Sequence, residues 1–255
     1  MEWAEKDDVF YVKSKRDNIT FMLQPFGASD DSLPTIMEGM ERWFSEQGLP
    51  FLLKGISTQF AERLERVLPG RYQFAGDRNN YDYVYLTENL IELTGRRFSA
   101  KKNHINYFLM HYPGFRYLPL TEELVPACIE SAEQWYERRD NGQAGLDSER
   151  VAIMEVLNNF TYLQLTGGVI EIYGKIEAFA IGEALNEEMA VIHIEKGNVG
   201  IRGLYQMINR EFCREAWSHM TYINREEDMG IEGLRRAKKT YNPIKMIAKY
   251  DVTKL

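Results

Sequence analysis

Two side chains able to move protons, His193 and Glu195, stand two positions apart in the mostly apolar run 190–195. Residues two apart in a β-strand share one face, so the spacing predicts His193 and Glu195 as neighbours on that face. A base and an acid placed together can deprotonate an attacking amine and protonate a leaving group. The alternatives are a polar strand face in contact with solvent, or a histidine satisfied by a hydrogen bond in the core.

A glycine-rich segment, Lys196 to Gly203, follows this strand and precedes a helix. A turn of this kind presents free backbone N–H groups at the positive end of a helix dipole, which suits a phosphate or pyrophosphate. The sequence therefore predicts an anion site formed by Asn198, Val199, Gly200, Ile201, Arg202 and Gly203. The alternative is a bulge followed by an ordinary helix start.

Two basic clusters stand out in a chain whose net charge is −7: residues 96–102 and residues 235–239. These windows contain eight of the 31 Lys and Arg residues, so the enrichment would suit a phosphate-rich partner. The alternative is two solvated helix ends, since cations favour the last turn of a helix. That alternative fits 235–239 but not 96–102, because Ser99 is expected to cap a helix start.

These residues must be positioned by elements whose order can be read from hydrophobic periodicity in the second half of the chain. Helices are predicted from about 121, 147 and 204 and over 231–239, and strands at 115–118, 169–173, 176–185, 190–195, 220–224 and 244–252. The order is β-α-α-β-β-β-α-β-α-β. This order predicts an α/β protein, in the mixed-sheet α+β form.

The first half of the chain repeats part of this order, with strands at 19–23, 51–53 and 72–75 and helices at 33–45 and 59–67. The similar spacing predicts a duplicated and diverged domain, and the alternative is one irregular mixed sheet. A strand at 81–86 and a helix at 99–111 would then lead to the second unit. The predicted domains are therefore 1–112 and 113–255, with the boundary near Pro113 and Gly114.

The element order of the second half resembles the GNAT acyltransferase fold. In that fold the turn between strand and helix holds the pyrophosphate of an acyl-coenzyme A, which implies that residues 198–203 bind coenzyme A. The glycine spacing here differs by one residue from the usual GNAT loop pattern. The resemblance also makes Tyr241 a candidate general acid, because GNAT enzymes often place a tyrosine near this point; the alternative is a packing residue before Asn242-Pro243.

A closer resemblance covers nearly the whole chain. It is carried by the stretches Asp82–Tyr85, Lys101–Asn106, His193–Lys196 and Asn224–Lys238. They resemble a bacterial family related to the C-terminal domain of phosphatidylglycerol lysyltransferase. The resemblance implies two GNAT-like domains in tandem and transfer of an acyl or aminoacyl group to a hydroxyl or amine. Within these stretches the candidate substrate-binding residues are Lys101, Lys102, Asn103, His104, Asn224 and Arg225.

Composition excludes several other classes. The net charge of −7 argues against a general DNA-binding role, and the longest apolar runs have four residues against the roughly 20 of a membrane span. Cys128 and Cys213 lie in helix-like apolar patterns without CxxC partners, which predicts buried thiols in a reducing cytoplasm. No HExxH, P-loop or GxSxG motif occurs, and His104 and His111 lack the acidic partner of a metal site, so no metal is predicted.

The sequence thus predicts a cytoplasmic tandem GNAT-like transferase whose second half is active, with Glu195, His193 and Tyr241 as catalytic candidates. The donor is a small molecule, the acceptor is unspecified, and acyl-coenzyme A is favoured over aminoacyl-tRNA because the acidic chain opposes long-range attraction of tRNA. The alternatives are a non-catalytic coenzyme A-binding or regulatory module and an aminoacyl-tRNA-dependent transferase. The deepest cleft is expected beside residues 195–203.

Overall fold

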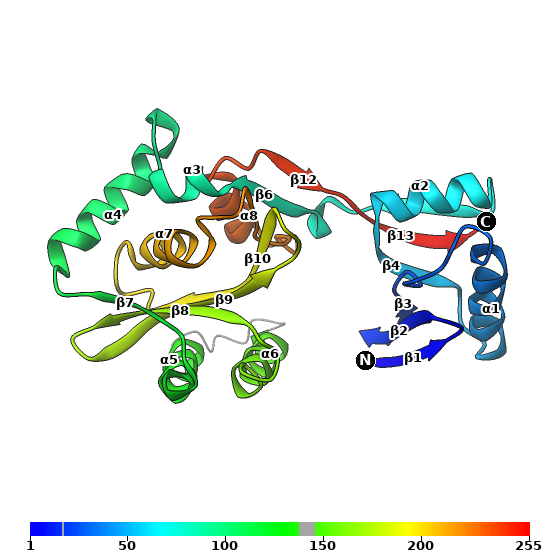
Figure 1. Cartoon of the computed structure of the whole chain (residues 1–255), viewed down its shortest axis with the longest axis horizontal. Coiled ribbons are helices and arrows are strands. Elements are labelled where there is room, and N and C mark those ends of the chain that lie inside the picture. The colour runs from blue at the N-terminus through cyan, green and yellow to red at the C-terminus, as the bar shows by residue number, and fades with distance from the viewer. Residues whose placement is uncertain (17, 138–145) are drawn as a thin grey trace. The chain divides into compact units, whose positions relative to one another are not determined.

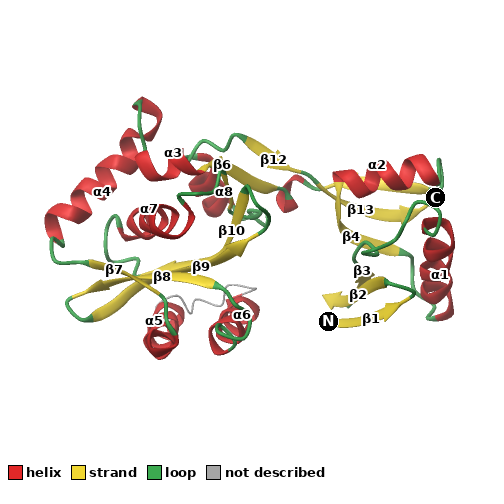
Figure 2. Ribbon diagram, viewed as in Figure 1, coloured by secondary structure: helices red, strands yellow, loops and turns green. Residues whose placement is uncertain are grey.

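The computed structural model describes residues 1–16, 18–137 and 146–255, which form two compact units (Figure 1). Unit 1 comprises Met1–Asp82, Glu227–Glu232 and Met246–Leu255, and unit 2 comprises Tyr83–Glu226 and Gly233–Lys245. Each unit is built around its own mixed sheet (Figure 2).

Unit 1 contains a six-stranded sheet in the order β1-β2-β3-β4-β13-β5. The strands are β1 (Glu2–Lys6), β2 (Val9–Arg16), β3 (Ile19–Met22), β4 (Leu52–Ser57), β5 (Tyr72–Gly76) and β13 (Lys249–Lys254). Only β3 and β4 pair in parallel; the other neighbours are antiparallel. Helices α1 (Leu33–Glu46) and α2 (Thr58–Val67) bury their apolar stripes with Leu53, Ile56 and Val252 of the sheet.

Unit 2 contains a seven-stranded sheet in the order β12-β6-β11-β10-β9-β8-β7. The strands are β6 (Asp82–Leu86), β7 (Arg116–Pro119), β8 (Thr166–Ile172), β9 (Lys175–Ala184), β10 (Met189–Gly197), β11 (Tyr222–Asn224) and β12 (Lys245–Ile247). One face packs against α5 (Val125–Glu137) and α6 (Leu146–Asn158), and α7 (Leu204–Trp217) covers the other (Figure 1). The remaining helices are α3 (Thr87–Glu92), α4 (Ser99–His111) and α8 (Glu232–Lys239), with short 3₁₀ turns at Arg78–Asn80, Arg96–Phe98 and Glu122–Leu124.

Leaving out β7, the two sheets share one strand order, as the predicted duplication requires. In both, three antiparallel strands lead to a single parallel pair, β3 with β4 and β10 with β11. In both, the strand beyond the parallel pair comes from the other half of the chain: β13 lies between β4 and β5, and β6 lies between β11 and β12. The mixed-sheet fold class is therefore confirmed.

The predicted boundary at 112–113 is corrected by this exchange of strands. The chain enters unit 2 at Tyr83, because β6 pairs with β11 and the buried side chains Tyr83, Val84 and Tyr85 lie in that sheet. The predicted final strand 244–252 is two strands in different sheets, β12 and β13. The hairpin of β1 and β2 and the short helix α3 were not predicted.

Candidate active site

The parallel strands β10 and β11 pair over only three residues each, Met189–Val191 with Tyr222–Asn224. A register shift between Ile192 and Ile194 leaves His193 as the extra residue of a β-bulge, which bends β10. Beyond Val191 and Asn224 the two strands are joined by side chains instead of ladder hydrogen bonds. Bulges of this kind often re-aim side chains beside active sites, and the candidate residues gather at this point.

An ion pair bridges the two strands. Glu195 on β10 accepts hydrogen bonds from Nη2 of Arg225, the residue after β11, and from Nδ2 of Asn209 on α7 at 2.8 Å. Both side chains are mostly buried, with 12% and 13% of their surfaces exposed. The Nε and Nη1 atoms of Arg225 are buried and have no hydrogen-bond partner among the described residues. Buried donors of a charged group are costly to leave unpaired, so an anion would satisfy them.

Two tyrosine rings flank the guanidinium. The Arg225 carbon Cζ lies 4.9 Å from the ring centre of Tyr241 and 5.8 Å from that of Tyr85. Burial raises the pKa of both phenols, so they stay protonated at neutral pH. The Tyr85 hydroxyl donates to the carbonyl of Lys238 at 2.9 Å, which fixes its ring.

A second cation completes the group. The Nζ of Lys101, in the first turn of α4, lies 4.1 Å from the ring centre of Tyr241. Burial, together with the nearby Arg225 charge, lowers the pKa of Lys101 to about 8, while Glu195 acts in the opposite direction. We call Lys101, Glu195, Arg225 and Tyr241 the charged cluster. It contains two basic groups and one carboxylate, so it favours a negative charge, and Lys101 can exchange a proton near neutral pH.

The predicted pairing of His193 with Glu195 is wrong, because the bulge separates the two side chains. The ring nitrogens of His193 lie 2.7 Å from Glu226 Oε1 and 3.0 Å from Glu183 Oε1. These carboxylates, first Glu226 and then Glu183, raise the pKa of His193 against the effect of burial. Glu195 instead binds Arg225 and Asn209, so the charged cluster contains two of the three catalytic candidates, Glu195 and Tyr241.

Some backbone amides of the predicted phosphate loop already donate hydrogen bonds within the loop. Asn198 Oδ1 accepts from the amide of Gly200 at 3.0 Å, and the Asn198 carbonyl accepts from the amide of Ile201 at 3.1 Å. Gly203 begins α7 with φ +90°, and a Cβ there would lie 2.2 Å from the carbonyl oxygen of His104. Helix α4 therefore packs directly on the start of α7, and the loop offers fewer free N–H groups than the pattern predicts.

The other predicted binding residues are not members of the charged cluster. Lys102, Asn103 and Val199 are exposed. Asn224 is buried, and its Oδ1 accepts from the amide of Glu226 at 2.7 Å, so it shapes the chain beside Arg225. The Arg202 guanidinium lies 4.5 Å from the ring centre of Tyr107, and buried Nδ1 of His104 has no partner among the described residues.

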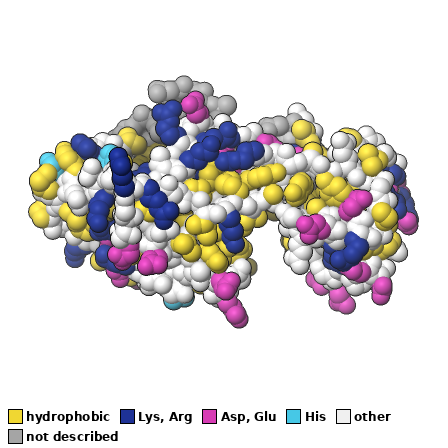
Figure 3. All heavy atoms as spheres, turned by 90° about the horizontal axis from the view of Figure 1, so that it is seen from above, with side chains coloured by type: hydrophobic (Ala, Val, Ile, Leu, Met, Phe, Trp, Pro, Cys, Tyr) yellow, Lys and Arg dark blue, Asp and Glu magenta, His cyan; other side chains and the backbone are white. Residues whose placement is uncertain are grey.

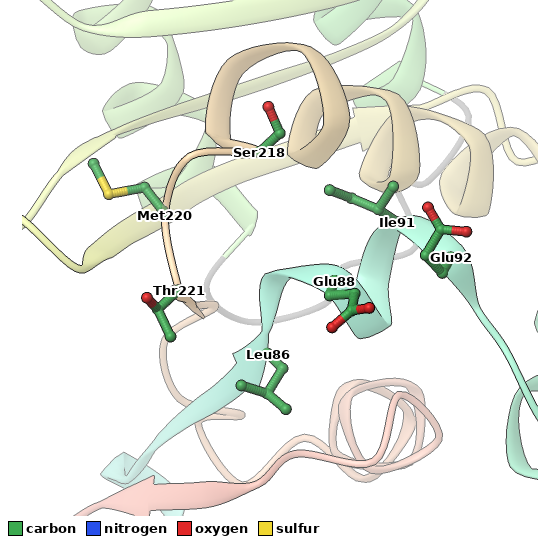
Figure 4. Close-up of a pocket in the computed structure, with 7 residues that line it drawn as sticks. All are labelled: Leu86, Glu88, Ile91, Glu92, Ser218, Met220 and Thr221. Carbon is green, nitrogen blue, oxygen red and sulfur yellow. The ribbon is translucent and has the colours of Figure 1, made fainter.

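Two cavities bear on the prediction of a deep cleft beside 195–203. The larger cavity, of about 280 Å³, lies between α3, the end of α7 and the start of β11, and is lined by Leu86, Glu88, Ile91, Glu92, Ser218, Met220 and Thr221 (Figure 4). The other cavity, of about 10 Å³, lies beside the loop and is lined in part by Trp135, Asn198 and Val199. The ion pair of Glu195 and Arg225 bridges the gap between β10 and β11.

Sequence reasoning missed Asn209 and Tyr85. Asn209 is buried in α7 and lies one helical turn before the buried Phe212 and Cys213. A polar residue at such a position is the signal that could have identified Asn209, since buried polar groups need partners.

Three further features of the described residues are the two cysteines, the groups that could hold a metal and the length of the helices. Cys128 and Cys213 are buried free thiols, as predicted, and burial raises the pKa of Cys128 to about 12. No group of three or more His, Cys, Asp or Glu side chains that could hold a metal occurs in residues 1–16, 18–137 and 146–255. In the same ranges, every helix is too short or too polar to cross a bilayer.

Comparison with known proteins decides the family. The family model described as "Phosphatidylglycerol lysyltransferase, C-terminal" matches residues 1–253. The chain belongs to this family. A conserved protein of unknown function from Bacteroides thetaiotaomicron VPI-5482 is 36% identical, with a TM-score of 0.91 over 99% of this chain and 85% of that one.

Two more distant structures share the fold. L-PGS from Bacillus licheniformis has a TM-score of 0.66 at 14% identity, over 98% of this chain and 83% of that one. A tandem GNAT protein from the clavulanic acid biosynthesis pathway has a TM-score of 0.51 at 7% identity, over 96% and 78%. The fold is therefore GNAT-like. An uncharacterised protein of Mycoplasmoides gallisepticum is 24% identical over 174 residues, which are 67% of this chain and only 55% of that protein.

Proposed function

We propose that unit 2 transfers an acyl or aminoacyl group from an activated donor to an amine or hydroxyl acceptor at the charged cluster. The observation that carries the proposal is the pair of cations, Lys101 and Arg225, beside one carboxylate at the gap between two parallel strands. Family membership supports a transferase, since the family is described by a lysyltransferase. The donor and acceptor are part of the proposal.

Arg225 is proposed to bind the negative charge that develops on the donor's carbonyl oxygen. Its Nε and Nη1 atoms are buried donors without a hydrogen-bond partner in the part of the chain that the structure describes, which is the arrangement that stabilises an oxyanion in a site sheltered from water. Glu195 and Asn209 hold the guanidinium through the Glu195 carboxylate, so Glu195 is a positioning residue in this scheme.

Lys101 and Tyr241 are proposed to move the protons. The new bond joins the acceptor nitrogen or oxygen to the carbonyl carbon, and the bond from that carbon to the donor's sulfur or oxygen breaks. Neutral Lys101 takes the proton of the acceptor, and the protonated Tyr241 phenol gives one to the leaving atom. Transfer of a proton from Lys101 to Tyr241, through solvent, restores both groups.

Coenzyme A remains the favoured donor, with the amides of Val199 and Gly203 and the side chain of Arg202 as candidate phosphate contacts. The basic side chains of unit 2 lie in several separate groups on the face that Figure 3 shows, which does not suit a continuous tRNA track. A tRNA donor would engage many phosphates, so its binding should weaken steeply with salt, whereas coenzyme A binding should weaken only slightly.

The test is transfer by the purified protein from radiolabelled acetyl-coenzyme A and from lysyl-tRNA to a panel of amines and phosphatidylglycerol vesicles. Lys101→Met and Arg225→Met should each lower the rate at least a hundredfold, while the control Lys175→Met, at an exposed lysine on β9, should leave it unchanged. Binding of a donor without transfer to any acceptor would instead favour a non-catalytic module. Equal losses in all three variants would refute the assignment of the charged cluster.

A further inference from the structure

The outer edge of β1 in unit 1 is an unpaired strand edge within the described residues. In the shared strand order β1 corresponds to β8 of unit 2, and β8 pairs on its outer side with the antiparallel strand β7. Unit 1 has no counterpart of β7 in residues 1–16, 18–137 and 146–255, and β1 pairs only with β2. The symmetry of the two sheets thus predicts that a further antiparallel strand fits beside β1. An exposed edge of this kind is a template for another chain.

The same edge carries exposed aromatic surface. All five residues of β1 are exposed, and Trp3, with 70% of its surface accessible, contacts Phe10 at 5.6 Å between ring centres. Register pairs Trp3 with Val12 and Glu5 with Phe10, so these four side chains share one sheet face. That face is opposite the helices, because the next residue, Tyr11, packs into the core with α1 and α2. Exposed aromatic patches at a strand edge mark interaction sites.

We propose that the occupant of this edge is β1 of a second copy of the chain, paired antiparallel about a two-fold axis at Ala4. This register places Glu2 of each copy opposite Lys6 of the other, so two opposite-charge pairs form. Trp3 then stands opposite Glu5 of the second copy and diagonal to its Trp3, which lies within reach of an aromatic ring. The two six-stranded sheets become one continuous sheet.

The charges on β1 favour this register over one that is shifted by a single residue. A shift of one residue would place Glu2 opposite Glu5 of the second copy, a like-charge pair, and would also turn the side chains of the added strand to the opposite faces. Glu2 already forms an ion pair with Lys13 of its own chain, at 2.8 Å. The Glu2 side chain is nevertheless 75% exposed, and its carboxylate can accept a hydrogen bond from a second donor. A five-residue pairing with one aromatic cluster is smaller than a standard interface, so we expect a dimer with a dissociation constant on the order of micromolar.

Sedimentation velocity between 1 and 200 μM tests the pairing with the full chain. The wild type should pass from monomer to dimer in this range. Lys6→Glu and Glu2→Lys should each weaken the dimer at least tenfold, because a dimer of either variant contains two pairs of like charges at positions 2 and 6. Their equimolar mixture should associate as the wild type does, because each Glu then faces a Lys. The control Lys15→Glu, an exposed lysine on β2, makes the same charge change away from the edge and should leave association unaltered.

Hydrogen exchange of residues 2–6 provides a second measurement that does not depend on the variants folding normally. Protection of these amides that rises with protein concentration supports the proposal. A wild type that stays monomeric at 200 μM overturns it, and so does a mixture of the two variants that associates no better than either alone. Protection of residues 2–6 that is complete in a monomer would show that a different occupant covers the edge, which also overturns it.

Discussion

Replacing Lys101 by Met should stabilise the protein while it removes activity. In the folded chain, burial and the Arg225 charge lower the pKa of Lys101 from 10.5 to about 8. At pH 7.5 about a quarter of the molecules then carry a neutral amine, against roughly one in a thousand for an ordinary lysine. Folding therefore opposes the ammonium form, and Met keeps much of the apolar stem without the charge.

The size of the effect follows from the shift. A difference of about 2.5 between the unfolded and folded pKa corresponds to at most about 3 kcal/mol at pH 7, and partial exposure of Lys101 lowers that limit. Because the unfolded chain binds more protons between pH 8 and 10.5, wild-type stability should rise with pH across that window. The advantage of Lys101→Met should be full below pH 8 and should disappear by about pH 10.5.

Urea denaturation of the wild type, Lys101→Met and the control Lys102→Met at pH 7 and pH 10 measures the difference. Lys102 is exposed, so its variant should change the free energy of unfolding by less than about 0.5 kcal/mol. The transfer rate of the wild type should increase through pH 8 as the Lys101 amine becomes neutral. A Lys101→Met variant less stable than the wild type at pH 7, or an NMR titration that gives Lys101 a pKa near 10.5, would refute the reasoning.

Three further predictions concern the residues around the charged cluster. Glu195→Gln leaves the Arg225 guanidinium without its carboxylate and should lower the free energy of unfolding, measured by urea denaturation, by about 3 kcal/mol. The double variant Glu195→Gln with Arg225→Met should regain part of that loss, and a double variant less stable than the single one would contradict the ion-pair argument. Gly203→Ala should lower stability by about 2 kcal/mol or more, because φ is +90° and the new Cβ would meet the His104 carbonyl. Gly200→Ala should cost less than about 1 kcal/mol, and equal changes in the melting temperatures of the two variants would contradict this. Glu226 and Glu183 raise the pKa of His193, so its contribution to stability is full below pH 6.5 and declines as the pH rises through the pKa of the folded state. The loss of stability in His193→Gln should therefore be larger at pH 5.5 than at pH 8.5, and a loss that grows with pH would be evidence against this.

Most elements of the fold could be predicted from local periodicity, and the errors lie where distant segments meet. The helix at 33–45 and the strands at 176–185 and 190–195 agree with α1, β9 and β10 to within one or two residues. The domain boundary could not be found in this way, because nothing local shows that β6 pairs with β11 or that β13 lies between β4 and β5. Strand pairing is set by tertiary contacts, which periodicity does not report.

The same limit applies to the geometry of the candidate site. Period two assigned His193 and Glu195 to one face, and a single extra residue in β10 was enough to separate them. Lys101 and Arg225 were named from family resemblance, but their meeting at Tyr241 depends on α4 packing on the start of α7. Lys101 lies far along the chain from Arg225 and Tyr241, so no local pattern could have shown that meeting.

The two related sheets differ in the groups that bridge the gap beyond their parallel pair, and this difference supports the proposal that unit 2 is the active unit. Unit 1 has the same gap beyond its parallel pair β3 and β4, and there Gln24 Oε1 accepts from the amide and hydroxyl of Ser57 at 3.3 and 3.2 Å. Ser57 in turn accepts from the amide of Phe60 at 3.1 Å and caps α2, so this gap is bridged by neutral groups with partners of their own. In unit 2 the equivalent bridge is an ion pair beside a lysine whose pKa is about 8. Two nitrogens of its guanidinium have no hydrogen-bond partner among the residues that the structure describes. Buried charge of this kind adds little to stability compared with an apolar or neutral bridge, so its presence in one of two related gaps favours a role in binding or catalysis there.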